Sequence, residues 1–125
     1  MNIVKLIGIA PQLVVTDVKK TAEYYKNTLG FTIIGLVAEP PVYAMVERDG
    51  FQVHFVKSDI HEIKKNKDFR SISYDFIIWV PEIDAFFEEL KSKNAIILDG
   101  IVKRTYGSRE FVIEDCDGHK ILIGD

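Results

Sequence analysis

Four side chains in this sequence could carry chemistry. His54, Asp75 and Glu110 could transfer protons, because imidazole and carboxylate groups are common general bases and acids. Trp79, the single tryptophan, could stack on a ring or face a cation. The sequence contains no nucleophile elbow, phosphate-cradling glycine loop, Cys-x-x-Cys pair or His-Glu-x-x-His helix. The enzyme classes that depend on these motifs are therefore excluded.

The length, charge and apolar runs of the chain exclude further classes of protein. The 125 residues predict one domain, and the net charge of −3 does not favour a nucleic-acid surface. The longest strongly apolar run covers 76–80 and ends at Pro81, whereas a membrane crossing needs roughly 20 residues. The N-terminus lacks the features of a signal peptide, and the one cysteine, Cys116, suits a reducing compartment. We therefore expect a cytoplasmic protein with no nucleic-acid or membrane partner.

Two amphipathic helices are predicted from apolar residues spaced by three and four positions. The first has its apolar face at Val18, Ala22, Tyr25 and Leu29. Asp17 or Thr16 can cap its start, and Gly30 is placed to end it. The second has its apolar face at Ile83, Phe87 and Leu90. It is expected to have Pro81 in its first turn and to end near Asn94.

Most of the remaining chain is rich in β-branched and aromatic residues and is interrupted by Asp-Gly turn pairs, which predicts strands and hairpins. The expected strands lie near residues 5–15, 31–38, 42–48, 51–57, 72–80, 95–98, 109–115 and 119–124. Residues 57–70 hold eight charges in fourteen positions and are expected to form a solvated connector.

The two halves of the chain repeat the same pattern. An offset of 65 residues pairs Val15 with Val80 and Tyr25 with Leu90, and an offset of 68 pairs the turn at 49–50 with that at 117–118. Both halves then become β-α-β-β-β modules, one over about 1–58 and the other over about 71–125. The predicted fold is α+β and a single domain, with two tandem modules that form a curved mixed sheet around a central cavity.

Several stretches, in this order and spacing, resemble the vicinal oxygen chelate superfamily, the glyoxalase and bleomycin-resistance group. They are the segment 10–18, Tyr24-Tyr25, Leu29-Gly30-Phe31 and the closing hairpin at 109–118, in which Cys116 replaces the usual proline. The segment 43–50 and Tyr106-Gly107 are most similar to the metal-free bleomycin-resistance branch. The resemblance implies small-molecule binding and a homodimer.

Enzymes of this superfamily typically bind a divalent metal with four side chains, and the resemblance places those positions at Ala10, His54, Asp75 and Leu122. Alanine and leucine cannot ligate, whereas catalytic sites usually supply three protein ligands. His119 lies in a hairpin whose phase points it away from Leu122. We therefore expect no metal and no other cofactor.

Because strand residues two apart share a face, the phase set by Asp75 predicts which side chains line the cavity. The expected ligand-binding residues are Gln12, Gln52, His54, Asp75, Ile77, Trp79, Tyr106, Glu110, Val112 and Leu122. This mixture suits a cationic or flat aromatic ligand. Four of the candidate residues also have a simpler interpretation: core or interface packing for Trp79, a hydrogen-bonded carboxylate at a sheet edge for Asp75, a satisfied structural histidine for His54, and a cross-strand or interface ion pair with Arg109 for Glu110.

Three functions remain open at this point. The first is a metal-independent small-molecule binding protein, which could sequester an antibiotic or toxin. The second is a lyase, isomerase or dioxygenase-like enzyme with an atypical or incomplete metal site, for which His54, Asp75 and Glu110 are the candidate catalytic residues. The third is a module that binds a protein partner through its sheet.

Overall fold

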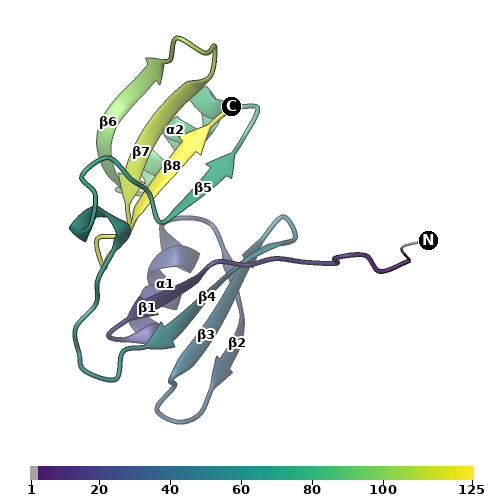
Figure 1. Cartoon of the computed structure of the whole chain (residues 1–125), viewed down its shortest axis with the longest axis vertical. Helices are drawn as coiled ribbons and strands as arrows, with labels where there is room; N and C mark the ends of the chain where they lie inside the picture. Colours follow the sequence, from purple (N-terminus) through teal and green to yellow (C-terminus); the bar gives the residue numbers. More distant parts are fainter. Residues whose placement is uncertain (1–2) are drawn as a thin grey trace.

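The computed structural model describes residues 3–125 and contains two modules with the same order of elements (Figure 1). Module one consists of β1 (Gln12–Val15), α1 (Val18–Asn27), β2 (Thr32–Val37), β3 (Tyr43–Arg48) and β4 (Phe51–Lys57). Module two consists of β5 (Phe76–Trp79), α2 (Ile83–Ser92), β6 (Ile96–Lys103), β7 (Arg109–Glu114) and β8 (Lys120–Gly124). The predicted α+β class and tandem repeat are confirmed.

Each module forms its own four-stranded mixed sheet. The strand orders are β1-β4-β3-β2, here called sheet A, and β5-β8-β7-β6, here called sheet B. The pairs β1–β4 and β5–β8 are parallel and the others are antiparallel. The sheets are not closed into one continuous sheet within residues 3–125, so each keeps two edge strands.

Local chemistry explains where the helices begin and end. The Asp17 carboxylate caps α1 by accepting a hydrogen bond from the Lys20 backbone N–H at 3.1 Å. Gly30 follows the helix with a φ of +78°, a conformation that disfavours other residues. The expectation that Pro81 lies in the first turn of the second helix is wrong, because α2 begins at Ile83 and Glu82 is its N-cap. Neither helix has the length and apolar character of a membrane span within residues 3–125.

The expected strand boundaries near the start of each module are also corrected. The first strand was expected over 5–15, but β1 covers only Gln12–Val15, and residues 3–11 lie outside any strand. The strand expected over 72–80 is limited to β5, and the one expected over 95–98 extends to Lys103 as β6. A strand needs a hydrogen-bonded neighbour, which local sequence pattern does not supply.

One hydrophobic core joins the two modules and occupies the helix-covered face of each sheet. Alternate strand residues such as Val15, Phe55, Phe111 and Ile123 are buried in it. Figure 1 shows the helices on the rear face of the sheets in that view. Their strand neighbours therefore lie on the opposite face, here called the open face of each sheet.

Candidate functional site

The open face of sheet A carries a connected set of polar side chains. Tyr43 Oη lies 2.8 Å from His54 Nδ1 and accepts a hydrogen bond from Gln12 Nε2 at 3.0 Å. His54 Nε2 lies 2.8 Å from Gln52 Oε1. Because the amide oxygen can only accept, this arrangement fits the tautomer in which Nε2 donates to Gln52 and Nδ1 accepts from the Tyr43 hydroxyl. Both ring nitrogens of His54 are thus engaged by neighbouring side chains.

Register explains how these residues meet. Gln12 and His54 are directly paired between β1 and β4, and His54 is paired with Met45 on β3. Tyr43 lies two residues from Met45 on the same face, so its long side chain reaches His54 diagonally. Gln12, Gln52 and His54 were named from the sequence, whereas Tyr43 was missed. Only the alternation along the strand could have indicated Tyr43, because Tyr43 and Met45 alternate with the buried residues Ala44 and Val46.

The open face of sheet B carries a row formed by Trp79, Gly124 and Glu110. These residues are neighbours in register across β5, β8 and β7. A Cβ placed on Gly124 would lie 3.6 Å from Ser108 Oγ and 3.8 Å from both Trp79 Cδ1 and Glu110 Cγ, so the gap that the glycine leaves between these side chains is about as wide as one methyl group. The Trp79 side chain is 70% exposed, whereas Glu110 is only 8% exposed. An aromatic plane and a carboxylate therefore border one gap.

Two neighbours hold the Glu110 carboxylate in place. Arg104 Nε and the Tyr106 hydroxyl each donate a hydrogen bond to Glu110 Oε1 at 2.8 Å, and neither contact uses Oε2. The hydrogen bond with Glu110 raises the pKa of Tyr106, which keeps the hydroxyl protonated as a donor. The sequence predicted Tyr106 and Glu110 as site residues but not Arg104. Arg104 lies in the loop after β6, where strand alternation does not indicate which way a side chain points.

The remaining predicted site residues have other surroundings. Asp75 accepts hydrogen bonds from the backbone N–H groups of Asn66 and Lys120, each at 3.0 Å, so both of its oxygens hold the connector against β8. Ile77, Leu122 and Val112 form a second row across the open face of sheet B. Glu110 does not pair with Arg109, which instead contacts Asp84 and Asp125.

A separate cluster of possible metal ligands, Asp115, Asp117 and His119, lies in the β7–β8 turn. Asp115 accepts hydrogen bonds from the Tyr25 hydroxyl at 2.8 Å, from His119 Nδ1 at 3.0 Å, and from the backbone N–H of Asp117 and His119. Asp117 accepts one from Thr21 Oγ1 at 2.5 Å. The cluster therefore ties module two to helix α1 of module one, and its oxygens are occupied by protein donors.

Burial and neighbouring charges shift the pKa values of His119 and Asp115 in opposite directions. Burial alone would lower the pKa of His119, but its hydrogen bond with Asp115 and the charges of Asp115, Asp75 and Asp117 raise it overall. Burial alone would raise the pKa of Asp115, but His119 and the Tyr25 hydroxyl lower it overall. Both shifts therefore favour the ion-paired form of His119 and Asp115.

This ion pair predicts a pH dependence of stability. The pKa of His119 is higher in the folded state than in the unfolded state. Its contribution to the free energy of unfolding is therefore complete below the unfolded pKa of 6.5 and is lost as pH rises through the folded pKa. The contribution of Asp115 is present above pH 3.8 and is lost as pH falls through its lowered value. We expect the free energy of unfolding in urea to decrease as pH rises above 6.5. His119→Gln should remove most of that decrease, and an unchanged slope in this variant would contradict the assignment.

Cys116, in the same turn, has a thiol that its surroundings hold in the protonated form. Burial and the nearby charges of Asp117 and Asp115 raise the pKa of its thiol to about 12, so the reactive thiolate is scarce at neutral pH.

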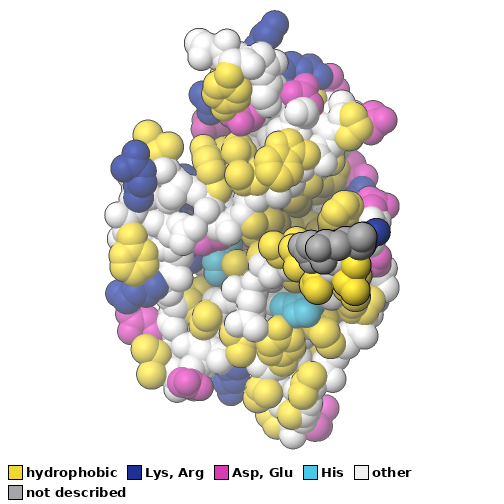
Figure 2. Space-filling view, turned by 45° about the vertical axis from the view of Figure 1, so that its right-hand side comes forward, with side chains coloured by type: hydrophobic (Ala, Val, Ile, Leu, Met, Phe, Trp, Pro, Cys, Tyr) yellow, Lys and Arg dark blue, Asp and Glu magenta, His cyan; other side chains and the backbone are white. Residues whose placement is uncertain are grey.

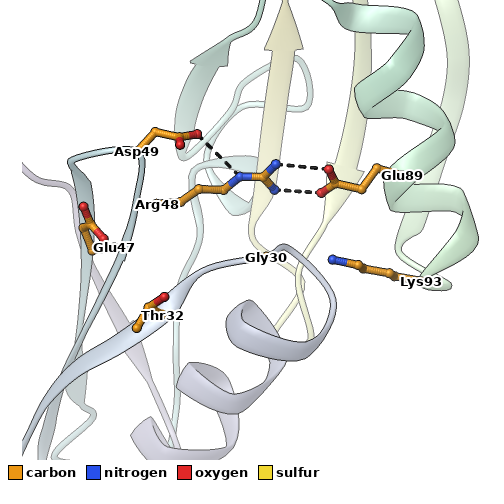
Figure 3. Close-up of a pocket in the computed structure, with 7 residues that line it drawn as sticks. All are labelled: Gly30, Thr32, Glu47, Arg48, Asp49, Glu89 and Lys93. Carbon is orange, nitrogen blue, oxygen red and sulfur yellow. Dashed lines mark hydrogen bonds and ion pairs between the residues drawn. The ribbon is translucent and has the colours of Figure 1, made fainter.

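A polar pocket of about 320 Å³ lies where the β3–β4 turn meets α2 (Figure 3). Arg48 Nη1 and Nη2 donate to the two carboxylate oxygens of Glu89 at 2.8 and 3.1 Å, and Nη1 also donates to the Leu29 carbonyl. The hydrogen bonds with Glu89 raise the pKa of Arg48. Arg48 and Glu89 are thus already used to join the modules, as Tyr25 and Asp115 are at the opposite turn.

The comparisons with known proteins agree on one family. The model of the Glyoxalase/Bleomycin resistance protein/Dioxygenase superfamily matches residues 6–123. The chain therefore belongs to this superfamily, as its sequence motifs predicted. No curated protein is similar enough in sequence to count as a match.

Solved structures share the fold at low sequence identity. TioX from Micromonospora sp. ML1 has a TM-score of 0.75 and 17% identity, covering 94% of this chain and 96% of that one. A superfamily member from Sphaerobacter thermophilus DSM 20745 has a TM-score of 0.76 and 18% identity, covering 96% and 97%. The bleomycin-binding protein from Streptomyces verticillus, solved with copper(II)-bleomycin, has a TM-score of 0.71 and 21% identity, covering 97% of both chains.

Proposed function

We propose that this protein binds and sequesters a small, flat, positively charged molecule, without a metal and without turnover. The observation that carries the proposal is the row on sheet B, where exposed Trp79 and the fixed carboxylate of Glu110 border the gap at Gly124. A tryptophan face attracts cations and stacks on planar rings, and a carboxylate pairs with an amine or amidine group. The bleomycin-binding protein among the structural neighbours supports a binding role.

The donor atoms at the superfamily's metal positions support binding without a metal. Ala10 and Leu122 have no ligating atom. Both nitrogens of His54 and both oxygens of Asp75 are engaged in protein hydrogen bonds. A divalent ion would therefore have to displace these partners to gain only two protein ligands, fewer than catalytic sites usually supply.

The proposal includes a cytoplasmic homodimer. Within one chain the open face of sheet B leaves Trp79 70% and Ile77 41% exposed, which is unusual for large apolar side chains that neighbour one another. A second copy placed against this face would cover it and would give a ligand walls on two sides. Figure 2 shows hydrophobic side chains gathered over the face that it draws.

Fluorescence titration tests the binding proposal directly, because Trp79 is the only tryptophan. We expect proflavine, ethidium or a bithiazole amine to quench its emission with a micromolar dissociation constant, and excess EDTA to leave that constant unchanged. Glu110→Gln should weaken binding by about tenfold, in line with the loss of one charged hydrogen bond. Glu88→Gln, which alters an exposed glutamate on α2, is the matched control and should have no effect.

Two outcomes would overturn the proposal. One is the absence of quenching by every member of this panel at millimolar concentration. The other is binding that requires added Ni²⁺, Zn²⁺, Mn²⁺ or Fe²⁺ and disappears in His54→Ala, which would favour the enzyme alternative.

A further inference from the structure

The guanidinium of Arg104 contacts Glu110 through one of its three nitrogen atoms. Nε donates a hydrogen bond to Glu110 Oε1 at 2.8 Å, and among residues 3–125 no hydrogen bond joins Nη1 or Nη2 to an acceptor. Arg48 differs, because its Nη atoms bind both oxygens of Glu89 and the Leu29 carbonyl. The Arg104 side chain is 42% exposed. Two of its nitrogens are therefore open to a ligand.

Arg104 extends the row on the open face of sheet B by one strand, from β7 to β6. Figure 1 shows β5, β8, β7 and β6 side by side in this order. Val102, on β6, is paired with Glu110, and Arg104 follows two residues later. The backbone N–H of Arg104 donates to the Ser108 carbonyl at 2.8 Å, which continues the pairing of the two strands. Because residues two apart share a face and neighbouring strands lie about 4.8 Å apart, the aromatic plane, the carboxylate and the guanidinium follow one another across roughly 15 Å.

The open groups of Glu110 and Arg104 are complementary. Arg104 and the Tyr106 hydroxyl both donate to Oε1 of Glu110, so Oε2 has no donor among the described residues and can accept from a ligand. The two Nη groups of Arg104 can only donate. The hydrogen bond with Glu110 raises the pKa of Arg104, which stays charged. The row therefore ends in one open acceptor next to a pair of open donors.

The charges of Arg104 and Glu110 cancel, which limits what a purely cationic ligand can gain. A positive group that approaches Glu110 Oε2 is attracted by the carboxylate and repelled by the guanidinium bonded to that carboxylate. A ligand that also carries a carboxylate offsets this repulsion, because the planar fork of arginine matches the two oxygens of a carboxylate. The arrangement thus favours a ligand with both charges over one with a positive charge alone.

We propose that Arg104 forms an anion subsite beside Trp79 and Glu110, and that the ligand is a flat amphoteric molecule with a carboxylate next to its cationic group. The ring lies on Trp79, the cationic group donates to Glu110 Oε2, and the carboxylate accepts from Nη1 and Nη2 of Arg104. Arg104 thus binds the ligand itself and does not only hold Glu110 in place. This inference rests on the proposed function and names the class of ligand that the same site takes.

Two dyes that differ only in a carboxylate test the class of ligand. 9-Aminoacridine and its 2-carboxylic acid share one flat cationic ring, and both are titrated against the fluorescence of Trp79, the only tryptophan. We expect the acid to bind the unaltered protein about tenfold more tightly at pH 7, because it gains one charged hydrogen-bonded pair. Equal dissociation constants, or weaker binding of the acid, would overturn the proposal.

Arg104→Gln separates a direct contact with the ligand from a positioning role. The variant lacks the charge and the fork of arginine but keeps an amide N–H that can donate to Glu110. We expect the acid to lose about tenfold in affinity, whereas 9-aminoacridine keeps its affinity or gains roughly twofold because the nearby repulsion is gone. A residue that only positioned Glu110 would weaken the binding of both dyes alike, and that result would rule out the subsite.

Two further variants complete the test, and circular dichroism checks that each variant is folded. Arg104→Lys keeps the charge without the planar fork, so the preference for the acid should fall only to about threefold. Lys103→Gln is the matched control, because it removes one positive charge at the adjacent position. Lys103 is paired with Arg109, which reaches Asp84 of α2, so it belongs to the helix-covered face. Lys103→Gln should leave the ratio of the two dissociation constants unchanged, and a loss equal to that in Arg104→Gln would replace the direct contact by a general effect of charge.

The outcomes separate this inference from the proposed function. If both dyes quench Trp79 with equal dissociation constants, the anion subsite is wrong and binding of a flat cation at the row stands. If the acid is preferred and Arg104→Gln keeps that preference, the carboxylate binds elsewhere and the subsite is again wrong. If neither dye quenches Trp79 at millimolar concentration, the row and the subsite both fail. A preference that is lost in Arg104→Gln and kept in Lys103→Gln supports both.

Discussion

Replacing Asp115 by alanine is expected to lower the free energy of unfolding by about 3–5 kcal/mol, since removing one member of a buried ion pair leaves the other charged and unpaired. Asp115 is 1% exposed and His119 is 2% exposed. The substitution would leave the His119 ring, the Tyr25 hydroxyl and two backbone N–H groups without their acceptor. Urea unfolding followed by circular dichroism measures the loss. A decrease below about 1 kcal/mol would contradict the structural role of this cluster.

Two adjacent tyrosines provide a matched control for the contact between modules. Tyr25→Phe removes the hydrogen bond that α1 donates to Asp115 and should cost about 1 kcal/mol. Tyr24→Phe removes the neighbouring hydroxyl, which donates no hydrogen bond to Asp115, and it should cost less than Tyr25→Phe. Equal effects of the two substitutions would show that the Tyr25–Asp115 contact contributes nothing specific.

Replacing Gly124 by valine is expected to weaken binding of proflavine by roughly 10- to 100-fold while leaving the protein folded. Overfilling a site typically costs about 1–3 kcal/mol, which corresponds to this range. A Cβ on Gly124 meets Trp79 and Glu110 at ordinary van der Waals distances, so the strand can hold the added carbon. The two further methyl groups of valine would then occupy the gap in which the ligand is proposed to lie. Trp79 fluorescence quenching measures the change.

A second glycine serves as the control for this prediction. A Cβ on Gly100, in β6, would have no atom within 4 Å, so Gly100→Val adds the same side chain away from the row. It should leave proflavine binding unchanged. Undiminished binding to the Gly124 variant, together with unchanged unfolding, would place the ligand elsewhere on the molecule.

Features governed by neighbouring residues were predicted well from the sequence. The spacing of Ala22 and Tyr25 predicted the buried face of α1, and Asp17 was correctly named as its possible cap. The alternation along 76–80 separated Phe76 and Ile78, which pack against the core, from exposed Ile77 and Trp79. The superfamily was predicted from short motifs in their order and spacing, and the family model that matches residues 6–123 confirms it.

The candidate site was predicted less well than the helices and strands, because it depends on contacts between segments far apart in the chain. Tyr43 was missed because its approach to His54 is set by strand register and by the reach of its side chain. Arg104 was missed because the loop after β6 brings it back to Glu110. Asp75 was correctly located next to β5, but its oxygens bind backbone groups of the connector and of β8, which matches the simpler interpretation weighed for it. The ligand-binding role of these residues stays a prediction.

By itself the sequence determined the elements and the identity of the modules, because helix caps, Asp-Gly turns and the period of apolar residues act over a few positions. Only the tertiary structure decided how the modules join, through Arg48 with Glu89 at one turn and Tyr25 with Asp115 at the other. It also showed that the expected long first strand begins only at Gln12 and leaves the apolar side chains of residues 3–9 exposed. The physical reason is the same in each case: hydrogen-bond partners and covered surface come from segments far apart in the chain.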